Sequence, residues 1–328
     1  DPRRREYKAL EFDPSEQCSD QVYNLWRGFE VNPKPGTCST YLDFVREIIC
    51  CGDEELFSYV IKWLAHLIQR PAELPEVALV LRAGQGTGKN TFVKPLMDIC
   101  GTHALETSSV DQLTGRFNGH LSDKILVHAN ESTWGGNKQA EGTLKTLITE
   151  PQRAIERKGQ DIVIMHNFAR LIVSSNEDWP VAAGLDDRRF VFLDVSDKQK
   201  QNAVYFSPIH EELNAGGTEA LLDYLFAVDI EAWHPRQRPK RKYGADILMA
   251  STCSVTRWLY RCLMEDQLVG SQAHLYQTIP HLFDNEVNNS TLYESYTTYC
   301  TKTRERKTES LSVFFKRIHN LCPSMSKV

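Results

Sequence analysis

A glycine-rich turn between an apolar run and a helix-like stretch is the feature that most constrains this chain. The turn reads Ala-Gly-Gln-Gly-Thr-Gly-Lys-Asn-Thr over residues 83–91, after an apolar run at 77–81 and before a helix-like stretch at 92–99. Glycines let the backbone approach an anion closely, and the first turn of a helix offers free N–H groups and partial positive charge. The order of strand, turn and helix therefore predicts a cradle for an anion such as a phosphate.

The turn matches the P-loop pattern G-x-x-x-x-G-K-[ST] with two departures. Ala83 takes the first glycine position and Asn90 takes the Ser/Thr position. Lys89 is placed to contact terminal phosphates, and Thr91 can offer Mg²⁺ the hydroxyl that Asn90 lacks. The predicted nucleotide-binding residues are Gly84, Gln85, Gly86, Thr87, Gly88, Lys89, Asn90 and Thr91. The alternative is a glycine-rich turn that ends a strand and binds nothing.

Composition and length narrow the class of protein. The 328 residues are 41% hydrophobic and 25% charged, which is ordinary for a soluble globular protein of about two domains. The nine cysteines include no C-x-x-C pair, so we expect reduced thiols and no zinc site. No apolar run approaches the ~20 residues that span a membrane, and we predict a cytoplasmic protein without a membrane partner. The net charge of −5 leaves nucleic-acid binding to local basic clusters.

Short, continuous apolar runs recur after the turn, at 125–129, 171–173 and 190–195. Such runs are typical of buried parallel strands, so the pattern predicts a three-layer α/β domain with a parallel central sheet. Residues 40–70 have helical periodicity; Asp53 can cap a helix there and Pro71 can end it. Alternating β-branched residues on either side of Lys158 and Gly159 predict a β-hairpin.

These patterns suggest a division of the chain into five parts. We predict an extended lead-in at 1–37, a helical module at 38–72, the P-loop core at 73–232, a basic linker at 233–249 and a helical C-terminal domain at 250–328. Because the first residue is Asp rather than Met, we expect the chain to be a fragment of a longer protein.

The second predicted strand ends in Asn130 and Glu131. In ATP hydrolysis a strand at this place commonly ends in two acidic residues, of which the first supports Mg²⁺ and the second polarises the attacking water. Glu131 is therefore the predicted catalytic base, and Asn130 joins Thr91 as a candidate metal residue. The alternative is that Glu131 caps the next segment.

The third predicted strand ends at Asn176, and two arginines follow at Arg188 and Arg189. An asparagine at a strand end can hydrogen-bond both the γ-phosphate and the attacking water. Arginine suits the neutralisation of a transferring phosphate, and one of the pair could reach the ATP of a neighbouring subunit. The alternative is a local salt bridge to the two aspartates that precede the pair.

The tip of the predicted hairpin is basic, with Arg157 and Lys158 beside Gly159. Point charges of this kind bind a phosphodiester backbone without reading its sequence. The hairpin is therefore a candidate site for single-stranded DNA. The alternative is a solvated turn that binds nothing.

The P-loop, strand-end carboxylate, basic hairpin, Asn-ended strand and arginine pair follow one another in an order that resembles superfamily 3 helicases, a compact branch of the AAA+ ATPases. More narrowly, the chain is similar to the helicase region of phage and plasmid primase–helicases and primase–polymerases. The segments that carry the resemblance are 23–29, 63–66, 84–91, 115–118, 141–150, 174–176 and 184–195, and together they span roughly residues 20–230.

The resemblance implies an AAA+-type ATPase that uses ATP and Mg²⁺, followed by a helical or winged-helix-like tail. It implies hexameric rings that move 3′ to 5′ on single-stranded DNA, and a primase–polymerase module in the same full-length protein. It also implies roles for individual residues: Lys89 and Thr91 on phosphates and Mg²⁺, Glu131 as base, Asn176 as sensor, Lys158 on DNA in the central channel, and Arg188 or Arg189 as an arginine finger acting in trans.

Two other functions stay open. Asn130, in place of an acidic residue, favours an ATP-dependent DNA-binding clamp or initiator without processive unwinding. An AAA+ machine that remodels proteins would need an apolar or aromatic pore loop, whereas the candidate hairpin is basic.

Overall fold

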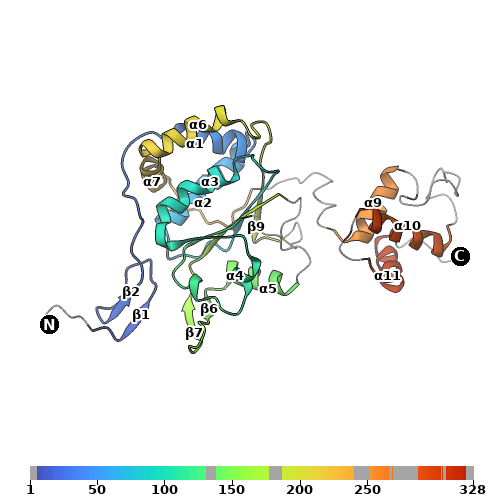
Figure 1. Cartoon of the computed structure of the whole chain (residues 1–328), viewed down its shortest axis with the longest axis horizontal. Coiled ribbons are helices and arrows are strands. Elements are labelled where there is room, and N and C mark those ends of the chain that lie inside the picture. The colour runs from blue at the N-terminus through green and yellow to red at the C-terminus, as the bar shows by residue number, and fades with distance from the viewer. Residues whose placement is uncertain are drawn as a thin grey trace. The chain divides into compact units, whose positions relative to one another are not determined.

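The computed structural model describes residues 6–130, 138–176, 187–239, 252–265, 268, 287–303, 305 and 308–322. The chain forms two compact units, Asp1–Arg241 and Lys242–Val328 (Figure 1). Each unit has its own hydrophobic core. The boundaries proposed within the first unit stay predictions.

A five-stranded, all-parallel sheet forms the centre of the first unit, with the strand order β4-β5-β8-β3-β9. Its strands are β3 (Ala78–Arg82), β4 (Ala104–Thr107), β5 (Leu126–Asn130), β8 (Arg170–Ser175) and β9 (Phe190–Asp194). The four apolar runs all form strands, which confirms the predicted α/β class with a parallel central sheet. The sequence patterns missed β4, a four-residue edge strand whose side chains are mostly half-buried or exposed.

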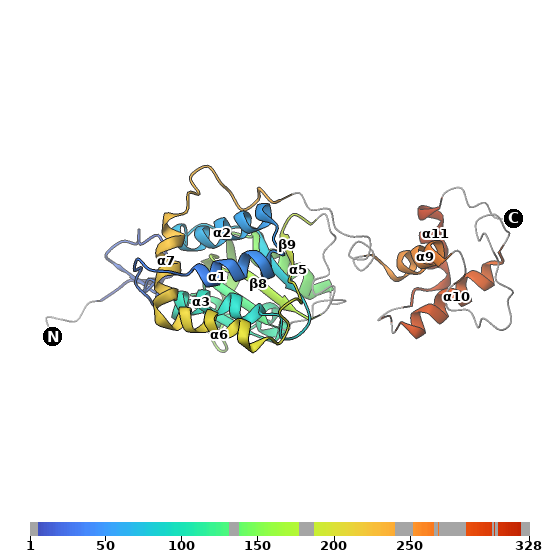
Figure 2. The same cartoon turned by 90° about the horizontal axis from the view of Figure 1, so that it is seen from above.

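Helices cover the sheet on both sides. Figure 2 shows α1, α2, α3, α6 and α7 together over one face, and Figure 1 shows α4 and α5 on the opposite side. Their bounds are α1 (Ser39–Phe44), α2 (Glu54–Gln69), α3 (Lys89–Cys100), α4 (Val110–Thr114), α5 (Lys138–Thr149), α6 (Ala203–Glu212) and α7 (Thr218–Ala227). Helix α2 starts where predicted, because the carboxylate of Asp53 accepts a hydrogen bond from the Leu56 N–H at 2.9 Å.

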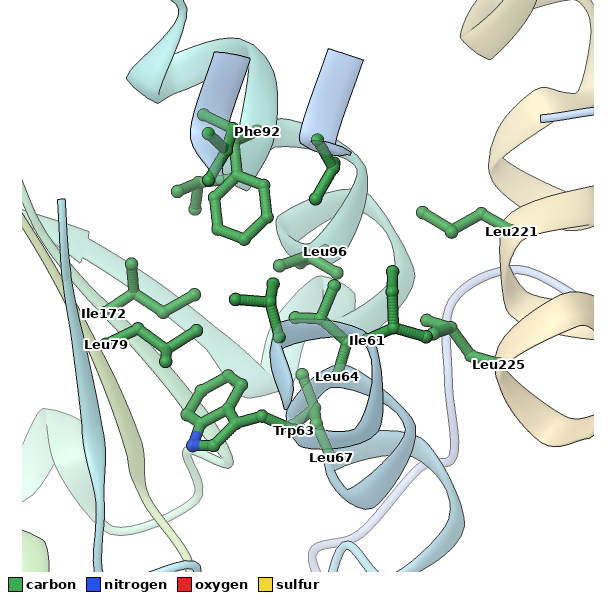
Figure 3. Close-up of a cluster of buried hydrophobic side chains, with 14 of the residues drawn as sticks. Ile61, Trp63, Leu64, Leu67, Leu79, Phe92, Leu96, Ile172, Leu221 and Leu225 are labelled. Atoms are coloured by element: carbon green, nitrogen blue, oxygen red, sulfur yellow. The ribbon is translucent and has the colours of Figure 1, made fainter. Parts of the chain in front are cut away.

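The core of this unit joins the early helices to the sheet (Figure 3). Trp63 and Leu64 of α2 face Leu79 of β3, with Phe92 and Leu96 of α3 beside them. The Trp63 indole N–H donates to the Val77 carbonyl oxygen at 3.0 Å, so this fully buried ring also has its polar atom satisfied. Truncating a buried aromatic of this kind typically costs ~3–5 kcal/mol. The packing fixes β3, and hence the glycine-rich turn that follows it.

A hairpin projects from the sheet body (Figure 1). Strands β6 (Gln152–Ile155) and β7 (Val163–His166) pair antiparallel, with Ile155 opposite Val163, which confirms the predicted hairpin. Gly159 at the tip has φ +75°, a backbone conformation that suits glycine. A second small pair, β1 (Ala9–Glu11) and β2 (Val22–Asn24), is parallel and lies in the N-terminal segment.

The second unit contains α9 (Ser254–Glu265), α10 (Asn289–Lys302) and α11 (Leu311–Leu321). Trp258, Tyr296 and Phe314 form its centre, and the last two rings stack with centroids 4.8 Å apart. The described residues of this unit form helices and no strand, so a winged-helix-like tail stays a prediction. Across the described parts of both units, we find no helix with the length and apolarity needed to cross a bilayer.

Candidate nucleotide-binding site

The glycine-rich turn connects β3 to α3 in a conformation that requires two of its glycines. Gly86 and Gly88 have φ values of +79° and +97°. A Cβ on Gly86 would lie 2.8 Å from Cγ of Gln201, and one on Gly88 would lie 2.8 Å from Phe206 and 2.9 Å from Phe44. Both the backbone angle and the close neighbours therefore exclude a side chain. The turn therefore packs closely against Gln201, Phe206 and Phe44, and it leads directly into α3.

Lys89, the predicted phosphate-binding lysine, is only 7% exposed. Its ammonium donates to the carbonyl oxygens of Ala83 and Gly84 at 2.7 and 2.8 Å. It also donates to Oδ1 of Asn176, the predicted sensor, at 2.8 Å. The fold thus brings together two candidate residues from β3–α3 and β8. All three acceptors are uncharged oxygens, and they hold the ammonium in place at the turn.

The candidate metal residues differ in their surroundings. Thr91 is buried and Asn90 is exposed. Asn130 donates through Nδ2 to Oε1 of Glu106 at 2.8 Å, so a carboxylate lies directly beside the position where an acidic residue was expected. Glu131, the predicted base, lies outside the described residues. Within the part of the chain that the structure describes, no three or more His, Cys, Asp and Glu side chains form a metal-binding group.

A row of polar side chains joins the carboxyl ends of β4, β5 and β8. His128 is buried, with Nε2 2.8 Å from Oγ of Ser174 and Nδ1 3.5 Å from Oε1 of Glu106. Burial lowers the pKa of His128 to about 4, against the opposing effect of Glu106. The imidazole is therefore neutral at pH 7 and serves as a fixed link between strands. Glu106 was not predicted, because it belongs to the strand that the apolar pattern missed.

The two arginines have different environments. Arg189 lies 3.2 and 3.3 Å from the carboxylate oxygens of Asp187, which also accepts its backbone N–H. Arg188 is exposed, and among the described residues it has no ion-pair partner. The local salt bridge considered for either arginine is thus present at Arg189. Asp186 lies outside the described residues.

The hairpin tip presents one lysine to solvent. Lys158 is exposed next to Gly159. Arg157 is also exposed, but its guanidinium donates to Oγ of Ser122 at 3.1 Å and its stem lies against Gly119. Lys158 is therefore the more available of the two predicted DNA-binding residues.

A brace that the sequence patterns did not assign fixes the base of the hairpin. The side chain of Asn118 donates to the Ala154 carbonyl oxygen at 2.9 Å and accepts from the Glu156 N–H at 2.8 Å. Arg116 forms an ion pair with Glu156 at 2.7 Å. Arg116 and Asn118 belong to the segment 115–118, which carried part of the family resemblance. The structure places both against the hairpin.

The residues that lead into β7 and begin it are apolar and exposed. Ile162, Val163 and Ile164 are 58%, 55% and 62% exposed. Successive strand residues point to opposite faces, so exposure of both Val163 and Ile164 means that neither face of β7 is covered at this point. The hairpin therefore combines a basic tip with an apolar strand.

Comparisons with known proteins agree with this architecture. A family of unknown function, DUF5906, matches residues 81–189, which run from the end of β3 to the arginine pair. A DNA primase-polymerase of Nitratiruptor phage NrS-1 is 30% identical over 182 residues, which are 55% of this chain and 25% of that protein. The chain thus spans about a quarter of the length of this curated relative.

A solved structure of the C-terminal region from NrS-1 has the same fold. Its TM-score is 0.66 at 20% identity, and the match covers 94% of this chain and 78% of that one. The agreement extends beyond the segment matched by the family of unknown function. The resemblance to a phage primase–polymerase is thereby confirmed: the chain is homologous to one such phage protein over about half of its own length and has the fold of that protein's C-terminal region.

Proposed function

We propose that the chain is the ATP-driven DNA helicase part of a phage or plasmid replication protein. The observation that carries this proposal is the contact between Lys89 and Asn176. It joins the glycine-rich turn to the end of the neighbouring strand β8, where a triphosphate and an attacking water would meet. The homology to a phage primase-polymerase supports the replication context.

In this proposal ATP binds along residues 84–91. The turn and the first N–H groups of α3 surround the phosphates, and Lys89 contacts the terminal ones. Mg²⁺, when bound, neutralises phosphate charge. The hydroxyl of Thr91 and the oxygen atoms of Asn130 and Glu106 are of the type that this ion prefers, so the residues present fit such a site.

Hydrolysis needs a base and an orienting group. A water attacks the γ-phosphorus, the bond to the bridging oxygen of ADP breaks, and a base takes the proton of the water. We assign the base to Glu131 and the orientation of water and γ-phosphate to Asn176. Asn176 is already positioned by Lys89.

Arg188 is our candidate for the finger that completes a neighbouring subunit's site. Its exposure leaves it able to cross an interface, whereas Arg189 is occupied by Asp187. A trans finger requires an oligomer, and a heterologous ring such as a hexamer supplies one at every interface. The same ring would surround single-stranded DNA and move along it in the 3′ to 5′ direction.

Lys158 is the proposed DNA contact. A hairpin whose base is braced and whose tip lysine is exposed can transmit subunit motion to a phosphodiester backbone. A primase–polymerase module in the full-length protein would use the strand so exposed. The place of action is then the host cytoplasm.

A second candidate is an AAA+ machine that acts on a polypeptide. The exposed Ile162, Val163 and Ile164 favour it, because apolar side chains are what such a machine needs to hold an unfolded chain. A third candidate, a DNA clamp or initiator without processive unwinding, is favoured by Asn130 in place of an acidic residue.

The three candidate functions predict different ATPase rates. The rate is measured for the chain by itself, with added single-stranded DNA, and with an added unfolded polypeptide. The helicase predicts stimulation by DNA, the clamp predicts DNA binding with little turnover, and the remodeller predicts stimulation by polypeptide alone. A rate that DNA leaves unchanged would remove the helicase proposal.

A further inference from the structure

The segment after β9 returns to the glycine-rich turn and lies against it. The Gln201 N–H donates to the Gly86 carbonyl oxygen at 2.8 Å. Within the segment, the Lys200 N–H donates to the Asp197 carbonyl oxygen at 2.9 Å, and Asn202 caps α6 through its side chain. These bonds fix the segment relative to the turn. No motif in the sequence pointed to it.

This contact brings a second lysine to the turn. Nζ of Lys200 lies 3.3 Å from the position that a Cβ on Gly84 would occupy. The same glycine accepts a hydrogen bond from Lys89 through its carbonyl oxygen. Bond geometry then places the two ammonium nitrogens within about 10 Å of each other.

Two like charges at one glycine repel each other unless an anion lies near them. The Lys200 side chain is exposed, and among the described residues no carboxylate forms an ion pair with it. Asp197 is the nearest acidic residue on the same segment, and it is exposed. The charge of Lys200 is therefore available to a ligand in the turn.

We propose that Lys200 is a second phosphate-binding lysine, which acts in cis and contacts the terminal phosphate of ATP. This inference rests on the proposed nucleotide binding and extends it. Lys89 is the lysine proposed to contact the terminal phosphates, and both Lys89 and Lys200 lie next to Gly84. The ammonium of Lys200 therefore lies near the terminal phosphate of a bound ATP. Lys200 would then distinguish ATP from nucleotides with fewer phosphates.

The test is nucleotide affinity in the full chain, measured by calorimetry for ATP, ADP and AMP. Lys200→Gln removes the charge and keeps most of the stem, and Lys200→Arg keeps the charge. Lys198→Gln is the matched control, since Lys198 is an exposed lysine on the same segment. A charge-assisted contact of an exposed lysine predicts about a five- to tenfold loss of ATP affinity in Lys200→Gln. ADP should lose less, AMP should be unchanged, and Lys200→Arg should recover most of the ATP affinity.

Equal weakening of all three nucleotides would mean that Lys200 merely supports the turn, and would overturn the inference. So would a Lys200→Gln affinity for ATP equal to that of Lys198→Gln. If the wild-type chain binds ATP while Lys200→Gln changes nothing, only this inference fails. If the wild-type chain does not bind ATP, the proposed function fails with it.

A measurement on the wild-type chain does not depend on the folding of any variant. Acetylation by an amine-reactive reagent, followed by mass spectrometry, reports the accessibility of each lysine. ATP should slow modification of Lys200 relative to Lys198, and AMP should not. Equal rates at Lys200 with and without ATP would contradict the proposed contact.

Discussion

Two lysines of the first unit carry the same charge in opposite settings. Lys89 is buried at the glycine-rich turn and donates to three oxygens of the protein. Lys158 is exposed at a hairpin tip. The first loses its side-chain freedom on folding, so a ligand finds it already placed. The second keeps that freedom, which suits a contact that must form and break as a polymer moves past it.

The difference between Lys89 and Lys158 shows what each kind of phosphate contact requires from the surrounding structure. A fixed ammonium needs a packed scaffold, here the core of α2, α3 and β3, with a carbonyl-lined turn above it. An exchanging contact needs only a rigid base, here the brace from Asn118 to the hairpin. Four predictions test this contrast, in order of decreasing effect.

Lys89→Ala should have the largest effect, because a chain that no longer binds ATP loses hydrolysis and DNA movement together. Loss of a buried charge at the phosphates should reduce ATP affinity more than about 100-fold, since charge-assisted bonds to phosphate are among the strongest in proteins. Calorimetry measures this directly. Lys94→Ala, on the same helix and in an exposed pair with Asp98, should bind ATP as the wild type does. Retained affinity in Lys89→Ala would remove the fixed ammonium from the site.

Arg188→Ala should lower the ATP hydrolysis rate by about 10³-fold, as for loss of an arginine finger, with ATP affinity retained. Mixing Arg188→Ala with Lys89→Ala subunits should restore activity, because an intact turn then meets an intact arginine at some interfaces. Arg189→Ala is the matched control, and it should cost stability through the lost pair with Asp187. The assignment is wrong if mixing rescues Arg189→Ala and not Arg188→Ala.

The buried residue His66 should make the free energy of unfolding depend on pH in the acid range. Burial, with Arg170 and Arg70 nearby, lowers the pKa of His66 to about 3. Below pH 6.5 the unfolded chain takes up a proton that the folded chain does not, so the free energy of unfolding falls. This one group should contribute a loss of about 3 kcal/mol between pH 6.5 and pH 4.

Urea unfolding at a series of pH values measures this loss. His66→Asn should show a shallower decline with falling pH than the wild type. His166→Asn, at an exposed position on the hairpin, should decline as the wild type does. Parallel curves for the wild type and His66→Asn would contradict the predicted effect.

Lys158→Ala should have the smallest effect, confined to DNA. One lost phosphate contact per subunit should reduce the slope of log affinity against log salt for single-stranded DNA by about 0.7. Basal ATP hydrolysis should be unchanged. Gln160→Ala, in the same turn and uncharged, is the control. An unaltered salt slope would exclude the hairpin tip from the DNA site.

The sequence patterns predicted the parts of the fold whose signals are local. Four apolar runs became strands, Asp53 capped α2, and the residues around Gly159 formed a hairpin. They missed β4 because an edge strand of four residues, Ala-Leu-Glu-Thr, has neither a continuous apolar run nor a clear alternation. Glu106 was missed for the same reason.

The remaining site features depend on tertiary contacts. Spacing alone allowed either arginine to be the finger, and we favour Arg188 because Arg189 pairs with Asp187. The approach of Lys200 to Gly84 joins residues more than 100 positions apart and follows from the return of the chain after β9. No motif contains such information.

ATP-dependent strand displacement is the most direct test of the central claim, that nucleotide binding at the turn drives movement along DNA. The substrate is a short duplex with a single-stranded tail on either its 3′ or its 5′ end, supplied with ATP and Mg²⁺. We predict displacement from the 3′-tailed substrate that is absent without ATP and lost in Lys89→Ala. Hydrolysis of ATP without displacement of either substrate would contradict the claim.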